Sequence, residues 1–167
     1  MSIATTLIVV SDRAAAGERA DETADLLRPV LAAARCDLQH VEIVPDDREA
    51  IAAAINLAAE RTPLVLTTGG TGCGPRDVTP EATRDAVDYE IPGLGEEMRR
   101  RSVASTIHAL GSRALAGAVS GDAVVLNLPG RPQGAVECFG FVAKALPHLV
   151  AVVTGPVSDA SHESPKA

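Results

Sequence analysis

A short apolar run that ends in a cluster of glycines constrains the fold of this chain more than any other feature. Residues 64–67 read Leu-Val-Leu-Thr, and four glycines follow within six positions: Gly69, Gly70, Gly72 and Gly74. Glycine tolerates a positive φ and lets the backbone approach a ligand closely, so we expect a positive φ at Gly70 and Gly72. Successive N–H groups in such a loop form an anion-binding concavity, and open α/β sheets bind ligands where their strands end. The segment therefore predicts a phosphate-binding loop after a buried strand.

Two better-known phosphate motifs do not fit this segment. It is not a P-loop, because no Gly-Lys-Ser/Thr follows the glycines. It is not a dinucleotide fingerprint, because the spacing is not G-x-G-x-x-G and Pro75 interrupts a helix there. A glycine-rich linker is the remaining alternative. Arg76, Asp77 and four threonines argue against it, since Arg76 can pair with a phosphate and Asp77 can hold a divalent cation.

The order of apolar runs predicts an α/β fold on a mostly parallel sheet. Strands are expected over 3–10, 38–44 and 64–67, separated by a helix over 21–35 and another after Asp46-Asp47. Continuous apolar strands are typical of parallel sheets that are covered on both faces. The β-α-β-α-β order implies right-handed crossovers that place the carboxyl ends of the strands along one edge.

The second half of the chain predicts further helices and one strand pair. Helices are expected from Thr79-Pro80, over 94–110 and from Arg131-Pro132. Strands over 114–119 and 123–128 form an antiparallel pair that places one odd strand at an edge of the sheet. Residues 1–154 are predicted to form one domain, and the polar segment 155–167 a disordered tail.

Composition and charge exclude several classes of function. The chain has 15 Lys and Arg against 22 Asp and Glu, a net charge of −7, and only 2% aromatic residues, so it lacks the features of a nucleic-acid binder. The three cysteines and four histidines have no zinc-ligand spacing, and the cysteines are expected to be reduced. No apolar segment approaches the ~18 residues that span a membrane, and residues 1–13 have the pattern of a strand. We therefore expect a cytoplasmic protein with no membrane or nucleic-acid partner.

Polar residues follow each predicted strand at this shared edge. They are Ser11-Asp12-Arg13, Pro45-Asp46-Asp47, the glycine loop with Asp77, and Asn127 to Gly130. Each has a simpler explanation: Asp46 and Asp47 can be a helix cap and a first-turn acid, and Pro129-Gly130 a tight turn. Four segments that converge on one edge nevertheless favour a binding site. Because carboxylates are hard ligands, Asp46 and Asp77 are interpreted as Mg²⁺ ligands in phosphoryl or nucleotidyl transfer.

The segment Thr67 to Thr83, TTGGTGCGPRDVTPEAT, resembles the signature of the molybdopterin adenylyltransferases, the MogA/MoaB type of molybdenum-cofactor biosynthesis proteins. Other segments agree in the same order: 9–13, 44–47, 91–99, 112–113, 126–132 and 135–138. The match covers residues 3 to about 150. It implies a three-layer α/β/α sandwich with a mostly parallel sheet and one antiparallel edge strand, assembled as a homotrimer.

The resemblance also implies an activity, the Mg²⁺-dependent transfer of AMP from ATP to the terminal phosphate of molybdopterin, with release of pyrophosphate. The catalytic acids of the family fall on Asp46 and Asp77. The expected substrate-binding residues are Ser11, Asp12, Thr67, Thr68, Gly69, Gly70, Thr71, Gly72, Arg76, Pro129 and Gly130. Hand-over of the product to a molybdenum-insertion protein is a further implication.

Two alternatives to this enzyme remain open. One is a non-catalytic paralogue that carries molybdopterin or a nucleotide for a partner, and the other is a nucleotide pyrophosphatase-like domain. Retention of both Asp46 and Asp77 favours the enzyme. The loop after Arg13 departs from the family because it lacks an aromatic residue and a later glycine, which leaves the role of Asp21 open.

Overall fold

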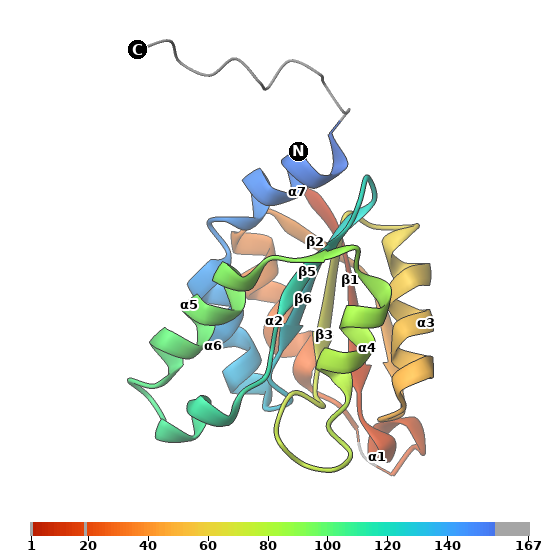
Figure 1. The fold of residues 1–167 in the computed structure, drawn as a ribbon, viewed down its shortest axis with the longest axis vertical. Helices are drawn as coiled ribbons and strands as arrows, with labels where there is room; N and C mark the ends of the chain where they lie inside the picture. Colours follow the sequence, from red (N-terminus) through yellow and green to blue (C-terminus); the bar gives the residue numbers. More distant parts are fainter. Residues whose placement is uncertain (1, 19, 156–167) are drawn as a thin grey trace.

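The computed structural model describes residues 2–18 and 20–155, so the tail predicted over 155–167 lies, apart from Gly155, outside the described residues. Six strands form one sheet in the order β2-β1-β3-β6-β5-β4 (Figure 1). Their bounds are β1 Ile3–Val10, β2 Cys36–Val44, β3 Leu64–Thr68, β4 Tyr89–Glu90, β5 Ala116–Val119 and β6 Ala123–Leu128. Strands β2, β1, β3 and β6 pair in parallel, whereas β5 is antiparallel to both of its neighbours. The predicted mostly parallel sheet with an antiparallel strand is therefore confirmed, and the short β4 adds the outermost pairing.

The helices cover both faces of the sheet. Their bounds are α1 Asp12–Ala15, α2 Thr23–Ala33, α3 Arg48–Ala59, α4 Thr79–Ala86, α5 Pro92–Ser102, the 3₁₀ helix η1 Ile107–Gly111, α6 Pro132–Val142 and α7 Leu146–Thr154. Figure 1 shows α2, α5 and α6 on one side of the sheet and α3 and α4 on the other. This arrangement is the predicted three-layer sandwich.

The core is split into two apolar clusters because successive strand residues point to opposite faces. In β1, Leu7 and Val9 join the cluster under α2, α5, α6 and α7, whereas Ile8 and Val10 join the cluster under α3 and α4. All four of these side chains are buried. The continuous apolar run of β1 therefore reflects burial on both faces, as expected for a strand inside a parallel sheet.

Three segments differ from the prediction. The helix expected over 94–110 begins at Pro92 and ends at Ser102, and η1 follows after Thr106, whose hydroxyl accepts a hydrogen bond from the His108 N–H. Ser and Thr side chains compete for backbone groups, which explains a break there. The last helix is also divided, because α6 ends at Val142 and α7 begins at Leu146.

A four-residue helix, α1, lies within residues 11–20, where the sequence predicts a loop between the first strand and the first helix, and the Ser11 hydroxyl caps it. Of the helices in the described ranges, none alone has the length and apolar character to cross a membrane. By length and composition the pair α6 and α7, bent by 73°, meets that test together.

Candidate functional site

The glycine loop lies where predicted, between the end of β3 and the start of α4, beside the ends of β1 and β6 (Figure 1). Its first two glycines have positive φ values, 97° at Gly69 and 62° at Gly70. A Cβ at Gly69 would lie 2.2 Å from the Val10 carbonyl oxygen, so only glycine fits there. The positive φ expected at Gly72 is wrong; a Cβ there would lie 2.8 Å from a carboxylate oxygen of Asp77, so a larger residue would have to displace that carboxylate.

Four consecutive backbone N–H groups in this loop, those of residues 70–73, have no hydrogen-bond partner within residues 2–18 and 20–155. The donors on either side of this run are engaged: Gly69 N–H donates to the Leu128 carbonyl at 3.3 Å, and Gly74 N–H to the Asp77 carboxylate at 2.7 Å. Backbone N–H groups rarely remain unpaired unless water or a ligand satisfies them. A run of four is the arrangement that binds the oxygens of a phosphate.

A buried network of side chains holds the base of the loop. The Asn127 amide donates to the hydroxyls of Thr67 and Thr83, each at 2.9 Å, and Thr83 donates to the Thr79 carbonyl. The Thr79 hydroxyl in turn donates to the Gly69 carbonyl at 2.8 Å. Asn127 and the three threonines are fully buried. The side chain of Thr67, a predicted binding residue, therefore points into this network, and its hydroxyl helps to fix the base of the loop through Asn127.

Arg113 holds the loop from the side. Its backbone N–H donates to the Thr71 carbonyl at 2.8 Å, and its guanidinium donates to the carbonyls of Gly72 and Asp77, each at 2.6 Å. The third guanidinium contact is an ion pair with Glu81 in the first turn of α4. Burial pushes the pKa of Glu81 upward, but the hydrogen bond from Arg113 and the nearby positive charges outweigh it and hold that pKa below its ordinary value.

Asp77 closes the tip of the loop. Its carboxylate accepts the Gly74 N–H, and its own N–H donates to the Gly74 carbonyl at 3.0 Å. The carboxylate therefore lies against the loop glycines: a Cβ on Gly72 would be 2.8 Å from one of its oxygens. The second carboxylate oxygen makes no hydrogen bond within the described residues. Asp77 thus shapes the loop whatever else it does.

Asp12 and Asp46 join the loops that follow β1 and β2. The Asp12 N–H donates to the Asp46 carboxylate, and the Asp46 N–H donates to the Asp12 carboxylate, both at 2.9 Å. Arg76 reaches back from the glycine loop and forms an ion pair with Asp12 at 2.8 Å. The Arg76 hydrogen bonds, followed by the Asp46 N–H, hold the pKa of Asp12 below its ordinary value. The structure therefore brings Asp12, Asp46 and Arg76 together.

The two predicted catalytic acids come from different loops, and both lie against the glycine loop. The free Asp46 oxygen is 3.2 Å from where a Cβ of Gly70 would stand, and Asp77 lies beside Gly72. Helix capping, the alternative explanation for Asp46, applies to its neighbour instead: Asp47 accepts the Ala50 N–H at 2.9 Å. In the described parts of the chain, no three His, Cys, Asp or Glu side chains are close enough to enclose a metal ion.

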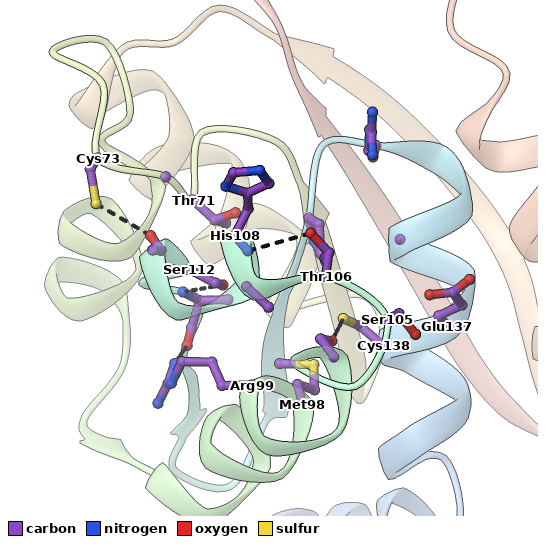
Figure 2. Close-up of a pocket in the computed structure, with 18 residues that line it drawn as sticks. Thr71, Cys73, Met98, Arg99, Ser105, Thr106, His108, Ser112, Glu137 and Cys138 are labelled. Atoms are coloured by element: carbon purple, nitrogen blue, oxygen red, sulfur yellow. Dashed lines mark hydrogen bonds between the residues drawn. The ribbon is translucent and has the colours of Figure 1, made fainter.

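A cavity of about 530 Å³ opens beside the loop, between α5, η1 and the start of α6 (Figure 2). On the loop side it is lined by Thr71, Gly72 and Cys73, three of the residues whose N–H groups are unpaired. Figure 2 shows Met98, Ser105, Thr106, His108 and Cys138 around it. Ser102 and Cys138 are in contact at 3.4 Å, and burial raises the pKa of the Cys138 thiol. The lining is mostly apolar with a few polar groups, as in many small-molecule sites.

A second hollow of about 80 Å³ is lined by Ser11, Thr68 and Gly130, among others. Gly130 approaches Gly69 so closely that a Cβ on it would lie 3.0 Å from the Gly69 Cα. The predicted residue Pro129 lines the large cavity instead. Ser11, Thr68, Pro129 and Gly130 are therefore all gathered at the expected edge of the sheet.

Several residues of this region are absent from the sequence prediction. Ser102 and most of η1 lie outside the matched segments, and Met98 and Cys138 lie inside them but have side chains that look like ordinary core. Arg99 lines the cavity as well, while donating to the Ala114 carbonyl at 2.6 Å. Arg113 belongs to a matched motif, but its contacts lie 32 to 42 residues away, so no local spacing reveals them.

Comparison with known proteins agrees with this arrangement. Residues 6–148 match the family described as "Probable molybdopterin binding domain". The chain is 40% identical over 135 residues to the molybdopterin adenylyltransferase of Haemophilus influenzae, covering 78% of this chain and 68% of that protein. It is 36% identical over 160 residues to the molybdenum cofactor synthesis protein cinnamon of Drosophila melanogaster, covering 94% of this chain but only 26% of that longer protein.

Among solved structures, the molybdopterin biosynthesis enzyme MoaB of Thermus thermophilus superimposes with a TM-score of 0.85 at 44% identity. The alignment covers 92% of this chain and 98% of that one.

Proposed function

This chain belongs to the family of molybdopterin-binding domains that includes the MogA and MoaB proteins, and we propose that it is a molybdopterin adenylyltransferase. The proposed reaction transfers AMP from ATP to the terminal phosphate of molybdopterin and releases pyrophosphate. An oxygen of the pterin phosphate attacks the α-phosphorus of ATP, and the bond from that phosphorus to the bridging oxygen of the β-phosphate breaks.

The observation that supports this function best is the run of unpaired N–H groups at residues 70–73. Both substrates carry phosphate at the reacting end, so a fixed set of donors can hold the phosphates and stabilise the charge that develops during transfer. Three of these residues line the large cavity, which has room for the ring system of a substrate. The site therefore combines a phosphate-binding loop with an adjacent, mostly apolar cavity.

Asp46 and Asp77 are proposed as the catalytic acids and as the residues that hold Mg²⁺. They fit this ion, because Mg²⁺ is commonly held by one or two carboxylates together with substrate phosphates rather than by a complete protein cage. Each has one carboxylate oxygen bonded to a backbone N–H and a second oxygen without a partner in the described chain. Bound Mg²⁺ would offset the negative charge of the phosphates.

The other predicted site residues border the site or position the catalytic acids. Ser11, Thr68 and Gly130 border the small hollow, and Pro129 borders the cavity. Asp12 positions Asp46 through two hydrogen bonds, in which the backbone N–H of each residue donates to the carboxylate of the other. Arg76 is 67% exposed and is proposed to exchange its ion pair with Asp12 for a substrate phosphate.

The test is direct incubation of the purified chain with molybdopterin, ATP and Mg²⁺, followed by detection of adenylylated molybdopterin and pyrophosphate. Product that forms with Mg²⁺ and not after EDTA treatment supports the enzyme. Tight binding of molybdopterin without any product would support the carrier paralogue instead. Hydrolysis of nucleotides without transfer to the pterin would support the pyrophosphatase-like alternative.

Four further features stay predictions: one functional domain over residues 1–154, assembly as a homotrimer, location in the cytoplasm, and hand-over of the product to a molybdenum-insertion protein. The trimer is testable by sedimentation equilibrium of the full chain. Hand-over is testable by adding the insertion protein to a turnover assay and measuring transfer of the labelled product.

A further inference from the structure

Arg113 binds both ends of the segment 71–77 at once. Its backbone and guanidinium donors engage the carbonyls of Thr71 and Gly72 at one end and the carbonyl of Asp77 at the other. The partners are 36 to 42 positions away in the chain, so these contacts form only in the folded protein. Glu81 forms an ion pair with the remaining nitrogen of the guanidinium and so fixes the orientation of its plane.

These contacts determine which way the loop N–H groups point. In a trans peptide the carbonyl of one residue and the N–H of the next point in opposite directions, and the described chain has no cis peptide. The Thr71 and Gly72 carbonyls point toward Arg113, so the N–H groups of Gly72 and Cys73 point away from it. Both N–H groups belong to the unpaired run, and both residues line the cavity.

We propose that the Arg113 side chain is a positioning group. By holding the Gly72 and Asp77 carbonyls it turns the Cys73 N–H outward to bind substrate phosphate, without a contact of its own to the reacting atoms, while the Arg113 backbone N–H holds the Thr71 carbonyl and so directs the Gly72 N–H. This inference rests on the proposed function for the identity of the ligand. A lysine cannot replace it, because an ammonium is a point charge and cannot span three acceptors in the plane of a guanidinium. The role therefore depends on the fork of donors and not on positive charge.

The experiment uses the full chain with Arg113→Lys and Arg113→Met, and inorganic pyrophosphate as the probe. Arg28→Lys and Arg28→Met are matched controls, because Arg28 also donates to a carbonyl, that of Leu38 at 3.1 Å, but on α2 away from the loop. Three quantities are measured well below the melting temperature: the Kd for pyrophosphate by calorimetry, amide hydrogen exchange over residues 70–78, and the circular dichroism of the fold.

Both Arg113 variants should remain folded, bind pyrophosphate about tenfold more weakly or worse, and exchange loop amides faster. Both Arg28 variants should bind pyrophosphate like the wild type. A merely structural role would lower the melting temperature and leave the Kd of the folded protein unchanged, which would overturn the proposal. Full affinity in Arg113→Lys, or no pyrophosphate binding by the wild type, would overturn it as well.

The outcome separates this proposal from the proposed function. If pyrophosphate binding depends on Arg113 but no adenylylated molybdopterin forms, the positioning role stands and the adenylyltransferase activity is refuted. If product forms at wild-type rates in Arg113→Lys with an unchanged Kd, the activity stands and the positioning role is refuted.

Discussion

Replacement of Gly70 by alanine tests how the glycine loop is built. Gly70 has a φ of 62°, and a Cβ there would lie 2.4 Å from the Thr79 hydroxyl oxygen and 3.2 Å from the Asp46 carboxylate. The methyl group of alanine therefore meets two obstacles. The backbone conformation is unfavourable for any L side chain, and the Thr79 side chain must move away.

The cost follows from these two effects. A left-handed conformation costs an alanine about 1–2 kcal/mol relative to glycine. Moving Thr79 breaks its 2.8 Å hydrogen bond to the Gly69 carbonyl, and a buried carbonyl left unpaired costs about 1–2 kcal/mol more. The total is about 3 kcal/mol, and for a chain of this size it lowers the melting temperature by about 6–12 °C.

Gly121→Ala is the matched control, because Gly121 also has a positive φ, 84°, in the turn between β5 and β6, but a Cβ there has nothing within 4 Å. Gly121→Ala should therefore lower the free energy of unfolding only by the cost of the left-handed backbone conformation, about 1–2 kcal/mol. Urea unfolding of both variants measures the difference, and pyrophosphate binding should weaken in Gly70→Ala alone. Equal unfolding free energies, with unchanged binding in both, would refute the reasoning that Thr79 and the loop geometry depend on Gly70.

Other variants test the acids of the site. Asp77→Asn should nearly abolish AMP transfer while pterin binding, measured by fluorescence, is largely kept; turnover close to wild type would remove Asp77 from the mechanism. Asp46→Asn should lower turnover far more than stability, whereas Asp47→Ala should lose about 1 kcal/mol of stability with normal turnover, because only Asp47 caps α3. Glu81→Gln should lower the melting temperature by about 3 °C at pH 7, from about 1 kcal/mol of the Arg113 ion pair. Because the folded-state pKa of Glu81 is lowered, this difference is present above the unfolded value of 4.5 and should vanish as pH falls through the folded-state pKa, in melting curves of both proteins.

The features that the sequence predicted well are those encoded by neighbouring residues. The apolar runs of β1 and β3 were placed within one residue of their observed ends, because strands buried on both faces leave a continuous signal. The pair β5 and β6 was recognised from its turn, and Pro80 marked the first turn of α4. Motif spacing likewise placed the glycine loop at the carboxyl end of a strand.

Errors arose where tertiary contacts decide the structure. The prediction treated residues 94–110 as one helix, because nothing in a helical pattern shows that the chain turns after Ser102 to form η1. Gly72 was assigned a positive φ, although its φ is not positive and the contact that a side chain there would meet is the Asp77 carboxylate. The sequence alone also left open whether Asp46 or Asp47 caps α3, and the hydrogen bonds show that Asp47 caps it while Asp46 pairs with Asp12.

The same distinction explains why the site depends on more than its motif. The glycine sequence makes the loop conformation accessible, since Gly69 and Gly70 adopt backbone angles that other residues avoid. It does not select that conformation, because glycine also gains the most freedom when the loop opens. Selection comes from residues distant in sequence, namely Asn127 beneath the loop and Arg113 beside it. A chain that kept every residue from Thr67 to Pro80 but lost the Arg113 side chain would therefore keep the motif and lose the contacts that fix the direction of the Cys73 N–H.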